Sequence, residues 1–175
     1  MFMKSVMSEE EAARTFVHDT IVGASTTWPA ISEGWRPWVK GNVDPIDSPW
    51  TMHEFILANA SARMRDLASW ALDKEQAERI RNYVMTFLST PDLKISSLEA
   101  FEEYDLAWSS ALAEAVPPFQ RLAETMFARI GARLPEGAME ESYRSVEFLL
   151  VVGQAVANFG GHYWRAAMQK SALVQ

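Results

Sequence analysis

The chain has 175 residues, of which 49% are hydrophobic and 22% are charged, and this suits one soluble domain with a continuous core. It contains no cysteine, which excludes disulfides, thiol redox chemistry and Cys-ligated metal sites. Its net charge of −7, without a cluster of Lys or Arg, argues against nucleic acids and anionic membranes as partners.

The amino terminus carries a helix start. Ser8 and Glu11 form a capping-box pattern, and apolar residues follow them at helical spacing. A first helix is therefore predicted over about 9–22. Three acids and no long apolar run follow the single Lys4, so this end lacks a secretory signal pattern and a cytoplasmic protein is expected.

The next segment is rich in tryptophan and proline. Residues 23–50 hold four of the seven Trp and four of the eight Pro. Because proline interrupts helices, an irregular segment with short helical turns at best is expected over 23–48. Its tryptophans indicate that it packs against the rest of the fold.

A second helix is predicted from Pro49 to about residue 72. Ser48 can cap its first turn, and proline at the first helical position loses no hydrogen bond. Steps of about 100° place a mostly apolar set on one face. This set includes a histidine: His53, Leu57, Ala60, Met64, Leu67 and Ala71. Polar residues flank it on both sides: Glu54, Arg65 and Ser69 on one, and Asn59, Arg63 and Asp66 on the other.

Further helices complete the prediction. Asp73 with Gln76 gives the cap of a helix over 74–88. The remaining predicted helices cover about 97–115, 117–133 and 138–170, the last interrupted at Gly160-Gly161. No segment shows sustained strand alternation, so the predicted class is all-α, a single-domain helical bundle over 1–175.

Several chemistries lack the residue patterns that they require. No glycine-rich phosphate loop is present, and the three histidines show no zinc or di-iron ligand spacing. No cofactor and no metal are therefore expected. The longest uncharged run, from Phe148 to Trp164, is too short and too polar for a membrane span.

Two groups of polar residues could hold chemistry. The first joins His53 and Glu54 with Asn59, Arg63 and Asp66 on the adjoining face. A histidine can exchange protons near neutral pH, and an arginine can bind a substrate carboxylate through two hydrogen bonds. The alternative is structural: a core or first-turn histidine, and an Arg63–Asp66 ion pair on the helix surface.

The second group lies in the predicted last helix. Gln154, Asn158 and His162 follow one another at four-residue spacing and form one polar line in an apolar run. Uncharged polar groups are costly to bury without partners, and a pocket with a polar small-molecule ligand would supply them. The alternative is the solvent side of an amphipathic helix, or a hydrogen-bond network between helices.

Five stretches occur in an order that is similar to a known family: "GWRPWVKG", "DPIDSPWTMHEFILANASARM", "LDKEQAERI", "EYDLAWSSAL" and "SVEFLLVVGQAVANFGGHYWRA". In this pattern, over about 28–168, the chain resembles the carboxymuconolactone decarboxylase and alkylhydroperoxidase D-like superfamily. The resemblance implies an all-α bundle that assembles as a trimer or hexamer. It also implies a small pocket beside the central helix.

The family's redox members carry a Cys-x-x-Cys pair and a histidine on the central helix. In one register, Glu54 matches the family's upstream acid and Trp70 its aromatic residue. The residues at the two thiol positions and the histidine position are then Asp66, Ser69 and Asp73. The other register requires a deletion and places the histidine position near 60–63. Neither register holds a thiol pair or the histidine, so peroxidase and disulfide reductase activity are not expected.

Two functions stay open. In the first, the chain is a cofactor-free lyase, decarboxylase, isomerase or hydrolase acting on a small cyclic or aromatic carboxylate. The catalytic residues would be His53, Glu54 and Asp66, and the ligand-binding residues Arg63, Asn59, Trp70, Gln154, Asn158 and His162. In the second, it is a non-catalytic ligand-binding or assembly protein of the same fold. The high Trp and Met content and the family resemblance favour a homo-oligomer.

Overall fold

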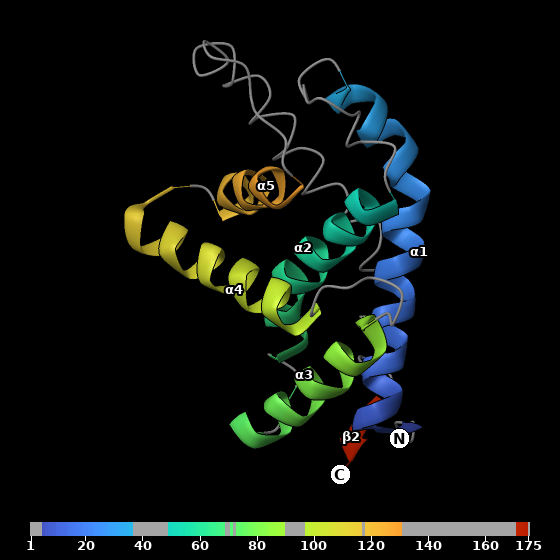
Figure 1. Cartoon of the computed structure of the whole chain (residues 1–175). Coiled ribbons are helices and arrows are strands. Elements are labelled where there is room, and N and C mark those ends of the chain that lie inside the picture. The colour runs from blue at the N-terminus through green and yellow to red at the C-terminus, as the bar shows by residue number, and fades with distance from the viewer. Residues whose placement is uncertain are drawn as a thin grey trace.

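The computed structural model describes residues 5–36, 49–68, 71, 73–89, 97–116, 118–130 and 171–174. Within these ranges the chain forms five helices and two short strands. Figure 1 shows their arrangement. The helices are α1 (Glu9–Trp35), α2 (Pro49–Ala68), α3 (Lys74–Leu88), α4 (Ser97–Glu114) and α5 (Pro118–Arg129). The strands are β1 (Ser5–Ser8) and β2 (Ser171–Val174). The predicted all-α class is confirmed, with one small strand pair added to it.

The helix α2 lies at the centre of the bundle and contacts the other four described helices. Figure 1 shows α1 and α4 on opposite sides of α2, with α3 packed along α1 and α5 packed near α4. Each helix supplies at least one side chain to the core that is at most 1% exposed: Phe16, Leu57, Ile80, Phe101 and Met126. Burial of these apolar side chains is the main force that holds the helices together.

Two of the predicted helix caps are confirmed. The side chain of Ser8 accepts a hydrogen bond from the backbone N–H of Glu11 at 3.2 Å. The side chain of Asp73 accepts one from the backbone N–H of Gln76 at 2.7 Å, and α3 begins at the next residue. Each cap satisfies a backbone donor that the first helical turn leaves without a partner.

The first helix is longer than predicted. The irregular segment expected over 23–48 is wrong up to Trp35, because α1 continues through Pro29 to that residue. A proline inside a helix removes one backbone hydrogen bond and clashes with the preceding turn. Tertiary packing offsets this cost: the ring of Trp28 lies 5.1 Å from that of Phe55 in α2. Residues 37–48 lie outside the described residues.

The strand pair was not predicted. β1 and β2 run parallel, in a register that pairs Ser5 with Ser171 and Ser8 with Val174. Four residues are too few to reveal a period of two in a sequence. Met7 is buried, and β1 contacts α1. The predicted helix over 138–170 lies outside the described residues.

The end of α4 has a left-handed residue. Ala115 has a φ of 56°, and the N–H of Val116 donates to the carbonyl of Ala111 at 2.9 Å. This bond closes the helix in the Schellman pattern, in which the left-handed position is most often glycine. None of the described helices is long and apolar enough to cross a membrane.

Candidate functional site

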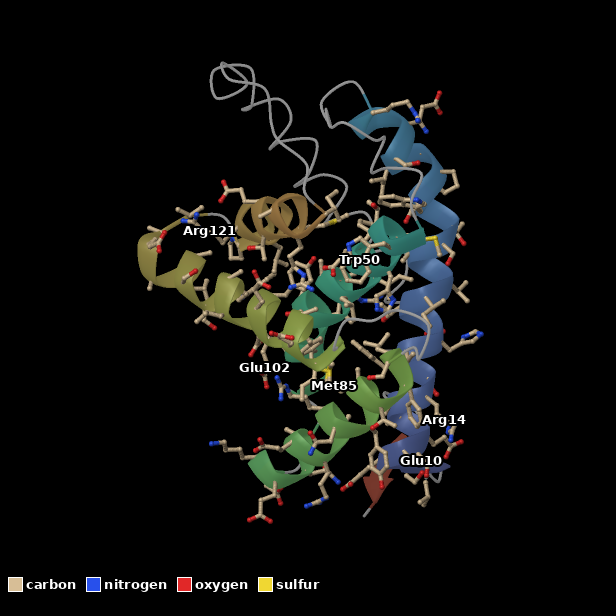
Figure 2. The ribbon with its side chains drawn as sticks, viewed as in Figure 1. Glu10, Arg14, Trp50, Met85, Glu102 and Arg121 are labelled. Carbon is tan, nitrogen blue, oxygen red and sulfur yellow. The ribbon has the colours of Figure 1, made fainter. Side chains whose placement is uncertain are left out.

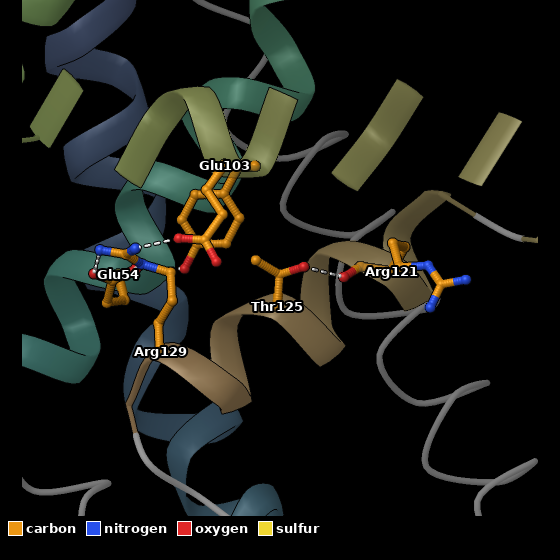
Figure 3. Close-up of polar contacts among 6 residues, drawn as sticks. Glu54, Glu103, Arg121, Thr125 and Arg129 are labelled. Carbon is orange, nitrogen blue, oxygen red and sulfur yellow. Dashed lines mark hydrogen bonds and ion pairs between the residues drawn. The ribbon is translucent and has the colours of Figure 1, made fainter. Parts of the chain in front are cut away.

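A fully buried carboxylate lies between three helices. Arg129 of α5 binds Glu54 of α2 through two hydrogen bonds, Nε to Oε2 at 2.8 Å and Nη2 to Oε1 at 3.0 Å. The hydroxyl of Tyr104 in α4 donates to Glu54 Oε2 at 2.5 Å. Arg129 also donates through Nη1 to Glu103, as Figure 3 shows. We call Glu54, Glu103, Tyr104 and Arg129 the Glu54 cluster.

The electrostatics of the Glu54 cluster favour a fixed structural arrangement. Burial, reinforced by the negative charge of Glu54, raises the pKa of Tyr104 well above its usual value, so its hydroxyl stays protonated and donates. The hydrogen bonds to Glu54 raise the pKa of Arg129. Three donor groups therefore satisfy the buried carboxylate, as a buried ion pair requires. The cluster joins α5 to α2 and α4.

His53 precedes Glu54 and has a different environment. It is half-buried, and its ring lies 6.1 Å from that of Trp50. Burial lowers the pKa of His53, and the nearby charge of Glu54 opposes this effect only in part. The imidazole is therefore mainly neutral at pH 7, which is the form that accepts a proton.

Two predicted ligand-binding residues are enclosed by the bundle. The amide of Asn59 donates to the backbone carbonyl of Phe55 at 2.7 Å, within its own helix. Arg63 is 2% exposed, and its guanidinium carbon lies 5.9 Å from the centre of the Phe16 ring in α1. This geometry is that of a cation–π contact. The alternative that places Arg63 on the helix surface is wrong, because α2 contacts the four other described helices.

The sequence prediction singled out Glu54 but missed the partners that surround it. Tyr104 and Arg129 come from two other helices, and Arg129 lies 75 positions from Glu54. No spacing along the chain indicates such a contact. The one available signal was physical: a carboxylate beside the apolar face of a helix needs a cation or a donor.

The rest of the predicted site cannot be placed with these residues. The side chain of Asp66, all of Trp70, and the line of Gln154, Asn158 and His162 lie outside the described residues. The structure brings His53 and Glu54 together only as neighbours on α2. Among the described side chains, no group of three or more His, Asp or Glu could hold a metal ion.

Comparisons with known proteins give no relative. No protein-family model, curated protein or solved structure matches the chain. The resemblance to the carboxymuconolactone decarboxylase and alkylhydroperoxidase D-like superfamily stays a prediction from the sequence pattern. The functional proposal therefore depends on the Glu54 cluster, on His53 and on the exposed surfaces of the helices.

Proposed function

We propose that the chain is a non-catalytic assembly protein, a helical bundle that acts by binding another protein. The observation that carries this proposal is the state of Glu54, which is 0% exposed and accepts hydrogen bonds from Arg129 and Tyr104. A catalytic acid or base must lie within hydrogen-bond distance of the substrate atom with which it exchanges a proton. Glu54 is instead committed to joining helices, and Asn59 and Arg63 are buried as well.

Exposed apolar side chains support a binding role. Several large apolar residues among the described ones are more than a third exposed: Val6, Ile21, Val22, Tyr83, Leu98, Leu106 and Leu112. Single exposed residues of this kind are ordinary on protein surfaces. Three of them, however, are leucines on one side of α4, where they form part of one surface.

Turnover assays with small cyclic and aromatic carboxylates test this proposal. We expect the wild-type protein to consume none of them, because Glu54 and Arg63 are enclosed in the bundle. The proposal is overturned if a carboxylate is consumed at a rate that falls in His53→Ala. His18→Ala is the matched control, since the side chain of His18 is 75% exposed.

One observation favours a second candidate function, a cofactor-free lyase, decarboxylase or isomerase acting on a small cyclic or aromatic carboxylate. His53 is half-buried with a lowered pKa, and Trp50 lies beside it. In this candidate, His53 accepts a proton from the substrate and Glu54 keeps α2 in position. Replacing a general base lowers the rate roughly 10²–10⁴-fold, so His53→Ala should lose activity to that extent. It should also lose the acid limb of the pH–rate profile.

A homo-oligomer is also part of the proposal. The prediction of a trimer or hexamer comes from the family resemblance, and either fits a protein that acts by assembly. Light scattering at working concentrations measures the mass directly. A monomeric mass contradicts this prediction and leaves binding to a different protein as the assembly function.

A further inference from the structure

We infer that one face of α4 is a docking surface for a basic amphipathic helix of another protein. This inference rests on the assembly function proposed above and names the partner's chemistry. The surface, called the outer α4 face, consists of Leu98, Glu102, Leu106, Ser109 and Leu112. Figure 1 shows α4 at the edge of the bundle opposite α1.

The outer α4 face is apolar and open to solvent. Leu106 is 70% exposed, Leu112 is 64% exposed and Leu98 is 44% exposed. Leu98, Glu102 and Leu106 follow one another at four-residue spacing, so they form one line along the helix. Leu106, Ser109 and Leu112 follow at three-residue spacing, so Leu112 lies on the other edge of the same side of the helix. The opposite side of α4 faces the core, where Ala100, Tyr104 and Ala107 are buried.

The charge of α4 indicates which kind of partner could bind the outer α4 face. The helix carries five carboxylates and no Lys or Arg: Glu99, Glu102, Glu103, Asp105 and Glu114. Arginines of other helices pair with three of them: Arg129 with Glu103, Arg65 with Asp105 and Arg121 with Glu114. Glu102 is exposed and forms no ion pair within the described part of the chain, and Figure 2 shows it on the side of α4 away from α5.

The carboxylate of Glu102 lies between two exposed leucines, Leu98 and Leu106. A purely apolar partner would cover the charge of Glu102 without compensating it, which is unfavourable. A partner that brings Lys or Arg compensates the charge while its apolar residues cover Leu98 and Leu106. Arg81 of α3 does not fill this role, because its guanidinium lies over the ring of Phe101, at 5.3 Å from the centre.

A second copy of α4 is a poor occupant for the same reason. It contains no cation to place against Glu102, and its own Glu102 would lie in the same surface as that of the first copy. A helix with leucine-like residues on one face and Lys or Arg beside them satisfies both requirements. Binding would then follow the mode in which an amphipathic helix lays its apolar face on an apolar surface.

A model peptide tests this surface. The probe is a leucine–lysine peptide of the length of α4, with all leucines on one helical face, and its binding is followed by fluorescence anisotropy. We expect Leu106→Gln and Leu112→Gln each to weaken binding about tenfold. Glu102→Lys and high salt should weaken it as well. Val22→Gln is the matched control, since Val22 is 50% exposed but lies on α1, and it should bind as the wild type does.

Four results would overturn the inference, and absence of any peptide binding is one of them. The first is equal binding of a scrambled peptide, and the second is wild-type affinity in the Leu106 and Leu112 variants. The third is a dimer in light scattering that Leu106→Gln dissociates, because a second copy would then occupy the face. Circular dichroism checks folding, and Glu102→Lys provides a test if a leucine variant unfolds. Absence of peptide binding overturns this surface alone, whereas His53-dependent turnover overturns the assembly function.

Discussion

Arg129 and Glu54 form a two-bond ion pair inside the bundle, although they lie 75 positions apart in the sequence. The carboxylate side chain is 0% exposed and the guanidinium side chain is 13% exposed. In such a pair, each charge depends on the other for compensation, because water is largely excluded. The pair therefore makes the docking of α5 on α2 sensitive to single substitutions.

Arg129→Met should destabilise the protein strongly. The substitution leaves Glu54 buried with only the Tyr104 hydroxyl, and breaking a buried pair costs about 3–5 kcal/mol in the free energy of unfolding. Urea denaturation measures this change. Arg121→Met is the control, since Arg121 pairs with the more exposed Glu114 and Glu124 and should cost less than about 1 kcal/mol. Equal effects of the two substitutions would contradict a buried, interdependent pair.

The pH dependence of stability should contain a contribution from His53. Its pKa in the folded protein is lowered by burial from an ordinary value of 6.5, so the unfolded chain binds this proton more readily. The free energy of unfolding should therefore fall as the pH drops below 6.5, and this fall should end below the lowered pKa.

Unfolding of His53→Asn at about pH 7.5 and about pH 5.5 checks this contribution. The variant should show a smaller loss of stability between the two pH values than the wild type. The same pH dependence in wild type and His53→Asn would show that burial does not affect this imidazole.

Ala115→Gly should stabilise the protein. Ala115 has a φ of 56°, and a left-handed conformation costs a residue other than glycine roughly 1–2 kcal/mol. We expect a net gain of about 1 kcal/mol in the free energy of unfolding, because the greater chain entropy that glycine loses on folding offsets part of the relieved strain. Ala113→Gly, in the last turn of the same helix, should have the opposite sign. A destabilised Ala115→Gly variant would argue against the left-handed end of α4.

Asp73→Ala should weaken the start of α3. The aspartate side chain satisfies the backbone N–H of Gln76, and replacing such a cap by alanine costs about 1 kcal/mol. Asp73→Asn keeps the capping oxygen without the charge and should restore most of the stability. Thermal unfolding of the three proteins measures the difference. If asparagine and alanine are equally destabilising, the charge and not the cap is what matters at this position.

Local features of the fold could be predicted from the sequence. The caps at Ser8 and Asp73 connect atoms only a few residues apart, so the sequence contains all the information that they need. The length of α1 could not be predicted in this way. Local rules end a helix near Pro29, whereas the contact between Trp28 and Phe55 depends on how two helices pack.

In the candidate site too, local features could be predicted from the sequence and contacts between helices could not. Glu54 could be singled out because it is a carboxylate beside an apolar face, but its partners Tyr104 and Arg129 could not. Their approach depends on the packing of α4 and α5 on α2. For Arg63 the sequence left two alternatives, a ligand-binding residue or a surface ion pair with Asp66, and the helix periodicity alone could not show that the residue is buried. The helix α2 instead contacts the four other described helices.

The pairing of β1 with β2 has a consequence for the order of folding. It joins Ser5 to Ser171, so its formation closes a loop of nearly the whole chain, and contacts this distant in sequence form slowly. Four residue pairs contribute little stability alone, so the ladder should persist only while the helices hold its two strands together. The backbone amides of β1 that bond to β2 should then exchange with solvent whenever α1 separates from the bundle. Protection of the β1 amides from hydrogen exchange therefore reports whether the whole bundle is folded.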